Sequence, residues 1–186
     1  MKKILFLTAG LLLAASTTFA QGPLGATAPT ATVQVNVNPE AALTIQTPAL
    51  VLTQTGNNFT DYSGVTAFTY FVRTKLAGGT GTIVLEVTTD FSAGGGSTPS
   101  VAAPPVAGDH LYYSCTVPSP THGASTPCTG PVNASTTAAT NVATFGTDAR
   151  SSSTGVASSV SWGLTNDPLY QTGSYTATIT YTISAA

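Results

Sequence analysis

Residues 30–38, Thr-Ala-Thr-Val-Gln-Val-Asn-Val-Asn, alternate polar and apolar side chains, and this alternation decides the fold class. Residues 174–183, Ser-Tyr-Thr-Ala-Thr-Ile-Thr-Tyr-Thr-Ile, repeat the pattern near the other end of the chain. Successive side chains of an extended strand point to opposite faces, so a period of two indicates a strand with one buried face. The sequence therefore predicts a β-strand near each end of the mature chain.

The residues between these segments carry the same signal. Runs rich in Thr, Val and aromatic residues are separated by Gly, Pro and Asn turns, and no window has a helical period. Further strands are expected at 42–46, 49–53, 67–74, 82–88, 110–117, 141–145 and 156–164. The strands at 67–74 and 82–88 flank a Gly-rich turn, which predicts a hairpin. Long loops are expected at 92–108 and 118–139, and the whole pattern predicts an all-β sandwich.

The first 20 residues have the composition of an export signal. Lys2 and Lys3 precede a short apolar run, and a small-x-small site ends at Ala20. The apolar run is too short to span a bilayer, and no transmembrane segment is expected after the signal is removed. We expect residues 21–31, rich in Gly, Pro and Ala, to form a flexible arm, and residues 32–186 to form one domain.

Charged residues are scarce, at 6% of the chain against about a quarter in a typical domain. After the signal, the only cations are Arg73, Lys75 and Arg150, and seven acidic side chains bring the net charge to −4. This balance disfavours a nucleic-acid partner. A surface made polar by Thr, Ser, Asn and Gln instead suits a molecule that is packed against others.

Cys115 and Cys128 are the only cysteines. An exported chain enters an oxidising compartment, so we expect a disulfide between them, worth roughly 3 kcal/mol for a loop of this length. A redox pair and a metal-thiolate site are the alternatives. The spacing is not Cys-x-x-Cys and no histidine stands nearby in a ligand pattern, which disfavours both.

No catalytic arrangement stands out in the sequence. His110 follows Asp109 and His122 lies in a loop, but no Gly-x-Ser-x-Gly motif accompanies them. The only glutamates are Glu40 and Glu86, and Glu86 is expected on a solvent face, so paired carboxylates for glycoside hydrolysis are not indicated. The aspartates fall in turns without a calcium-loop motif. We expect no enzyme activity, no metal and no cofactor.

Trp162 and the adjacent pair Tyr112 and Tyr113 could either bind a ligand at the surface or pack in the core. Trp162 alternates with Val160 and Leu164, and could be a sugar-stacking platform, although a core Trp is the commoner use in a sandwich. Tyr112 and Tyr113 are adjacent, so one is expected in the core and the other on the surface.

The edges of the predicted sheets are unguarded. Residues 30–38 and 169–186 contain no charge, and sheet edges without charge or proline invite pairing with another strand. The two terminal strands could pair with each other in one molecule or between molecules. In the second case, residues 21–38 of one copy would complete the sheet of the next, and Val33, Val35 and Val37 would fill its pockets.

These terminal segments resemble a known family. Residues 32–45, TVQVNVNPEAALTI, resemble the opening strand of spore coat U-type and related chaperone–usher pilins, and residues 173–183, GSYTATITYTI, resemble their closing Gly-x-Tyr strand. The resemblance implies an incomplete immunoglobulin-like sandwich, completed by a donor strand within residues 21–38. The residues it places in the acceptor groove are Tyr175, Ile179, Tyr181 and Ile183.

The sequence therefore leads to an exported structural subunit that polymerises head to tail by donor-strand exchange into an extracellular, cell-surface fibre with a role in adhesion. The expected partners are copies of the same chain, together with a periplasmic chaperone and an outer-membrane assembly protein. The alternative is a monomeric secreted module that binds carbohydrate or another surface. It would use the loops at 92–108 and 118–139 with Tyr112 or Trp162.

Overall fold

A computed structural model of the chain describes residues 31–91 and 97–186. The expected signal at 1–20, all but the last residue of the expected arm at 21–31, and part of the loop at 92–108 lie outside the described residues. The chain divides into an N-terminal segment that ends at Asn36 and a compact domain from Val37 to Ala186. None of the described residues forms a helix long and apolar enough to cross a membrane.

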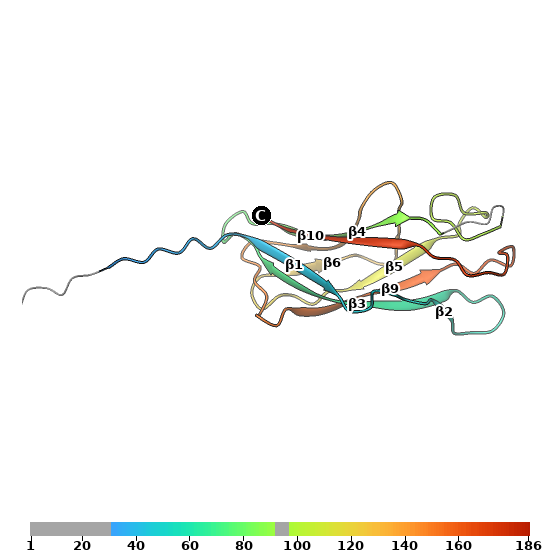
Figure 1. Ribbon diagram of the computed structural model, residues 1–186, viewed down its shortest axis with the longest axis horizontal. Helices are drawn as coiled ribbons and strands as arrows, with labels where there is room; N and C mark the ends of the chain where they lie inside the picture. Colours follow the sequence, from blue (N-terminus) through green and yellow to red (C-terminus); the bar gives the residue numbers. More distant parts are fainter. Residues whose placement is uncertain (1–30, 92–96) are drawn as a thin grey trace, which may run out of the picture. The chain divides into compact units, whose positions relative to one another are not determined.

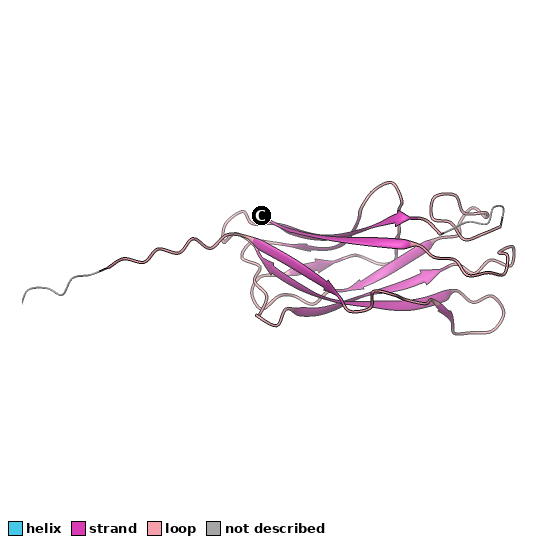
Figure 2. Ribbon diagram, viewed as in Figure 1, coloured by secondary structure: helices cyan, strands magenta, loops and turns pink. Residues whose placement is uncertain are grey.

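The domain is an all-β sandwich of two antiparallel sheets (Figures 1 and 2). One sheet has the order β1-β3-β9-β5-β7, with β2 also paired to β3. Its strands are β1 (Glu40–Ile45), β2 (Thr53–Gln54), β3 (Tyr62–Arg73), β5 (Leu111–Thr116), β7 (Val132–Asn133) and β9 (Val156–Leu164). The other sheet has the order β10-β4-β8-β6. Its strands are β4 (Gly81–Thr89), β6 (Ser125–Pro127), β8 (Thr140–Phe145) and β10 (Thr178–Ala185).

The core lies between the inner faces of the two sheets, as the alternation predicts. On β3 the inward side chains are those of Phe68, Tyr70 and Val72, which are at most 4% exposed. On β4 they are those of Ile83, Leu85 and Val87, at most 1% exposed. The outward residues of both strands are mostly half-buried, which is the pattern expected of a sheet with one covered face.

Trp162 belongs to this core. It is 6% exposed, its ring centroid lies 5.4 Å from that of Tyr113, and its indole N–H donates a 3.0 Å hydrogen bond to Thr66 Oγ1. Tyr113 is fully buried and Tyr112 is half-buried on the outer face, so the opposite placement predicted for the two tyrosines is confirmed. A sugar-stacking role for Trp162 is wrong, because a buried ring offers no face to a ligand.

The predicted hairpin between β3 and β4 is also wrong. The two strands are consecutive in the chain but belong to different sheets, since β3 pairs with β1, β2 and β9 and β4 pairs with β8 and β10. Residues 74–80 form an arch from one sheet to the other. Alternation identifies the buried face of a strand but not the strand beside it, and a Gly-rich turn suits an arch as well as a hairpin.

The terminal strands begin and end elsewhere than predicted. Residues 31–39 form no strand, and the first strand is β1, which follows Pro39. The segment expected as a strand at 49–53 is reduced to β2 at its far end, and β10 begins at Thr178 rather than at Ser174. A segment that lacks a hydrogen-bonded neighbour has no ladder, whatever its alternation.

Candidate functional site

The two sheets meet at one side of the domain without a hydrogen-bonded connection. Among the residues that the structure describes, β1 is the edge strand of its sheet and pairs only with β3, and β10 is the edge strand of the other and pairs only with β4. β1 and β10 lie side by side (Figure 1), with Cα atoms within 8 Å of each other. We call these two facing edges the open seam. Each edge leaves unpaired backbone N–H and C=O groups on its outer side.

The apolar side chains of the open seam are only half covered. On β1 the inward residues are Ala41, Leu43 and Ile45, and every one is of intermediate exposure. On β10 they are Ile179, Tyr181, Ile183 and Ala185, and these too are of intermediate exposure. The inward side chains of β3 and β4, one strand further in, are almost completely buried. The core therefore lacks cover where the two sheets come together.

The four residues predicted to line an acceptor groove have different positions. Ile179, Tyr181 and Ile183 share the inner face of β10 and pack against the core. Tyr175 precedes β10, is half-buried in line with them, and donates a 2.8 Å hydrogen bond from its hydroxyl to the carbonyl of Gln171.

Tyr181 packs from the open seam against the core. Its ring centroid lies 6.0 Å from that of Phe68, and burial raises the pKa of its hydroxyl to about 12. The side chains of Thr66 and Trp162 lie close enough to oppose this shift, but within the described residues neither forms a hydrogen bond of ordinary geometry with the Tyr181 hydroxyl. An unsatisfied buried polar group destabilises a protein by about 1–3 kcal/mol, so the packing beneath the open seam is not optimal in the single chain.

The predicted donor valines are all exposed. Val33 is 87% exposed, Val35 75% and Val37 66%, and the stretch to which they belong joins no sheet in the described residues. Among the described residues β10 pairs only with β4, so the described part of the first alternating segment, residues 31–38, does not pair with the last one inside one molecule. Three largely exposed β-branched residues at every second position are unusual for a segment that joins no sheet within the described part of the chain.

The opposite side of the sandwich is closed. The short strands β7 and β6 end the two sheets there, and the predicted disulfide is confirmed, with Cys115 on β5 and Cys128 just after β6 at a Cα–Cα distance of 5.6 Å. The Cys128 N–H also donates to the carbonyl of Val142 on β8. The disulfide therefore ties one sheet to the other covalently, on the side away from the open seam.

Histidines and carboxylates do not form a catalytic cluster. His110 and His122 are exposed, and the hydrogen bonds they make among the described residues come from their backbones. Glu40 is ion-paired with Arg73, and Glu86 is half-buried on the outer face of β4. Across residues 31–91 and 97–186, no three His, Cys, Asp or Glu side chains are grouped as a metal site.

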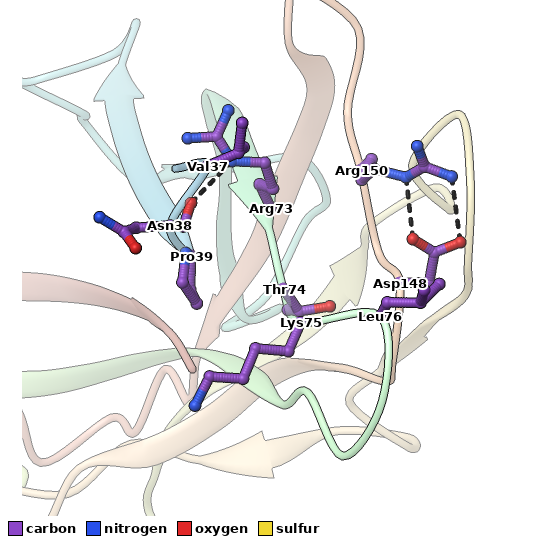
Figure 3. Close-up of a pocket in the computed structure, with 9 residues that line it drawn as sticks. All are labelled: Val37, Asn38, Pro39, Arg73, Thr74, Lys75, Leu76, Asp148 and Arg150. Carbon is purple, nitrogen blue, oxygen red and sulfur yellow. Dashed lines mark hydrogen bonds and ion pairs between the residues drawn. The ribbon is translucent and has the colours of Figure 1, made fainter. Parts of the chain in front are cut away.

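A surface pocket of about 260 Å³ lies at one end of the domain, where β3 ends (Figure 3). Its wall includes the three cations Arg73, Lys75 and Arg150. Arg73 Nε donates a 2.8 Å hydrogen bond to the carbonyl of Asn38, and Arg150 forms a two-pronged ion pair with Asp148 at 3.0 Å. Lys75 has no ion pair among the described residues, and its backbone carbonyl accepts from the Asp148 N–H.

Sequence reasoning identified β10 as one wall of the open seam but missed β1 as the other. A partial signal was present, because Ala41, Leu43 and Ile45 occupy every second position, although Ala42 between them is also apolar. It missed the gathering of the cations as well, because Arg73 and Arg150 are brought together by an isolated bridge between residues 77 positions apart. Comparison of the chain with protein-family models, with curated proteins and with solved structures gives no match.

Proposed function

We propose that the protein is an exported structural subunit that polymerises by donor-strand exchange into an extracellular fibre. The observation that carries the proposal is the open seam, two adjacent sheet edges whose inward apolar side chains are only half covered. The same chain carries an exposed, alternating, uncharged segment, residues 31–38, that pairs with no other strand among the described residues. The sandwich would be an incomplete immunoglobulin-like fold, which a strand from a second copy completes.

The open seam and the alternating N-terminal segment are chemically complementary. An added strand offers backbone N–H and C=O groups to the free edge of β10 or β1, and its alternate side chains enter the core. Val33, Val35 and Val37 have the spacing that places all three on one face. Burying a valine completely is worth about 1.5 kcal/mol or more, so three of them provide a substantial driving force beside the backbone hydrogen bonds.

The open seam must widen for a strand to enter. β1 and β10 approach within 8 Å, whereas two strands on either side of a third lie about 9–10 Å apart, twice the spacing of neighbouring strands. The required movement is therefore a few ångströms at most. Because β1 and β10 share no ladder hydrogen bonds, this movement breaks apolar contacts only.

The first experiment deletes residues 21–36 from the mature chain and compares its assembly with that of the intact mature chain by size-exclusion chromatography and negative-stain microscopy. The intact chain is expected to form filaments, on its own or with an assembly factor, and the shortened chain to remain monomeric. A synthetic peptide of residues 21–38 is expected to bind the shortened chain and raise its melting temperature. Filaments from the shortened chain would refute the proposal.

A pair of substitutions tests the face of the donor strand. Val35→Asp places a charge on the face that enters the core and is expected to abolish peptide binding, because burying an unpaired carboxylate is highly unfavourable. Gln34→Asp places the same charge on the opposite face, and the peptide is expected to bind nearly as well as the unmodified one. Equal loss for both variants would contradict an alternating donor strand and favour a loosely bound or non-strand contact.

A further inference from the structure

The open seam has two candidate occupants, the alternating segment of the same molecule and that of another molecule. We propose that the Asn38-Pro39 junction keeps the segment of each subunit, residues 31–38, out of its own open seam, so that the occupant is the same segment of a second copy. The inference rests on the proposed donor-strand exchange and names the partner that this exchange requires.

Proximity favours the occupant that would stop assembly. Only two residues, Asn38 and Pro39, connect Val37 to the start of β1. A segment tethered this closely has an effective concentration in the millimolar range at its own open seam, which no second copy matches in dilute solution. A chain without a barrier to self-insertion would therefore close its own seam and remain a monomer.

Self-insertion requires the chain to reverse its direction immediately before β1. A strand in the open seam lies one strand spacing, about 4.8 Å, from β1, whether it bonds to β1 or to β10. Residues 31–37 would therefore run antiparallel to β1 and form a hairpin with it. Asn38 and Pro39 must belong to the loop of this hairpin, because β1 begins at Glu40, which pairs with Arg73 on β3.

A two-residue loop would turn the valines to the wrong face. With residues 38–39 as the loop, Val37 lies opposite Glu40. Two residues further along, Val35 lies opposite Ala42. Residues opposite each other in an antiparallel pair share one face, and Glu40 and Ala42 are exposed, outward residues of β1. This loop would therefore leave the valines in water and direct the polar residues between them into the core, which is the effect of a slip by one residue.

A three-residue loop restores the face but strains the backbone. It places Val37 opposite Ala41, which faces inward. The usual loop of this length has two residues in the right-handed helical region followed by one in the left-handed region. Asn38 would need the right-handed conformation, which the ring of Pro39 disfavours in the residue before it. Glu40 would need the left-handed conformation, which is unfavourable for a residue with a Cβ atom.

Arg73 adds a second obstacle to the three-residue loop. Its Nε donates a 2.8 Å hydrogen bond to the carbonyl of Asn38 (Figure 3), and its Nη2 lies 2.7 Å from a carboxylate oxygen of Glu40. One guanidinium therefore contacts both neighbours of Pro39, and a loop that includes Glu40 would remove this residue from its place opposite Arg73. An exposed ion pair contributes little by itself, so the main barrier is the backbone of residues 38–40.

A longer loop fills the open seam less completely than a second copy does. A loop over residues 36–40 brings Val35 opposite Ala41, but Val37 then lies in the loop and is lost to the core. The segment of a second copy has no covalent connection to this β1. It can therefore enter in the register that turns all three valines inward, without a hairpin. The junction thus selects a second copy over closure within one molecule.

The test changes the loop so that self-insertion becomes favourable. The double substitution Pro39→Asp with Glu40→Gly gives the loop sequence Asn-Asp-Gly, which suits a three-residue hairpin with glycine in the left-handed position. We expect the full mature chain with this double substitution to remain monomeric where the unmodified chain forms filaments. It should also lose binding of the 21–38 peptide and melt at a higher temperature than the unmodified monomer.

Two single substitutions are the matched controls. Glu40→Gly removes the ion pair with Arg73 but keeps Pro39. Pro39→Gly gives a two-residue Asn-Gly loop, which forms hairpins readily but turns the valines outward. Both are expected to assemble like the unmodified chain in size-exclusion chromatography and negative-stain microscopy. The contrast between Pro39→Gly and the double substitution separates the face of the valines from the flexibility of the junction.

Hydrogen exchange of the unmodified chain gives a readout that needs no variant to fold. When the mature chain is diluted until it is monomeric, the amide hydrogens of residues 33–37 should exchange at the rate of an unstructured peptide, and in the double variant their exchange should be slower. Slow exchange in the unmodified monomer would overturn the inference. Filaments from the double variant would overturn it too, and the proposed function would stand if the chain without residues 21–36 stays monomeric. Absence of both filaments and peptide binding in the unmodified chain would overturn both.

Discussion

At the scale of single residues, two tyrosines of the core, Tyr70 and Tyr181, show how packing differs between the closed interior and the open seam. Tyr70 is completely buried, and its hydroxyl donates a 2.6 Å hydrogen bond to the carbonyl of Pro118. Tyr181 is half-buried on an edge strand, and among the described residues its hydroxyl makes no hydrogen bond of ordinary geometry, although Thr66 and Trp162 lie nearby. The same side chain is therefore satisfied in one place and unsatisfied in the other.

Replacing each tyrosine by phenylalanine should give opposite results. Tyr70→Phe removes a hydrogen bond and leaves the Pro118 carbonyl without this donor, so we expect the free energy of unfolding to fall by about 1 kcal/mol. Tyr181→Phe removes an unsatisfied hydroxyl and should be neutral or stabilising. Urea unfolding of the two variants at neutral pH measures the difference. A loss at Tyr181 as large as that at Tyr70 would show that its hydroxyl is bonded after all.

The pH dependence of stability follows from the same burial. Burial raises the pKa of Tyr70 to about 12, while a phenol in the unfolded chain titrates near 10. Because the unfolded state then releases its proton first, stability is fully present below about pH 10 and is lost as the pH rises toward about 12. The loss is about 1.4 kcal/mol per pH unit for one such group. Unfolding curves of Tyr70→Phe over this range should have a shallower decline than those of the unmodified chain.

Gly163 is required by its neighbour rather than by its own backbone. A Cβ at this position would overlap the ring of Tyr112, which lies over Gly163 on the adjacent strand. Gly163→Ala should therefore displace Tyr112, break its hydrogen bond to Asp61 and destabilise the domain by about 1–3 kcal/mol. In a Tyr112→Ala background the same substitution should be tolerated. Thermal unfolding of the two single variants and the double variant tests this coupling, and additive losses would contradict it.

At the scale of elements, the disulfide links strands that belong to different sheets. Replacing both Cys115 and Cys128 by serine should lower the free energy of unfolding by roughly 3 kcal/mol, because the unfolded chain regains the freedom of a closed loop of this size. Reduction of the unmodified chain should have a similar effect. Unfolding in denaturant with and without a reductant measures the loss, and no change would show that β6 and β7 hold the closed side unaided.

Predictability from the sequence differs from one element to the next. β9 was predicted with both of its bounds, because Val160, Trp162 and Leu164 alternate on a buried face between clear turns. The hairpin predicted between β3 and β4 was wrong, because local alternation contains no information about the partner strand. Residues 31–38 carry the same alternation as β9 but join no sheet in the single chain. Alternation shows that a segment can join a sheet, but contacts with other parts of the chain decide which strand it pairs with.

At the scale of the whole molecule, the open seam leaves apolar surface in contact with water. We expect a dye that fluoresces on apolar surfaces, such as ANS, to bind the monomeric mature chain. Addition of the 21–38 peptide, or assembly into filaments, should remove most of this fluorescence, because Ile179, Tyr181 and Ile183 become covered. If the monomer does not increase the fluorescence of the dye, the apolar side chains of the open seam are already covered.

The grouping of the charged residues could not have been predicted from composition. Seven acidic and three basic side chains give the net charge but not their positions. The positions depend on the antiparallel order of the strands, which brings Arg73 and Arg150 together while placing Asp61 and Asp167 at the far end of the domain. Sequence reasoning therefore supplied one edge of the candidate site, β10, while the second edge, β1, and the grouping of the charges emerged only from the topology.

The disulfide on the side away from β1 and β10 has a mechanical consequence. If a fibre of these subunits is pulled, the load passes along the inserted strand and tends to separate the two sheets at β1 and β10. The Cys115–Cys128 disulfide holds the sheets together on the other side. The two sheets therefore separate only at the open seam, and they stay aligned while the strand is withdrawn. A stretched fibre built this way recovers its links when the tension ends, because no subunit has lost its own fold.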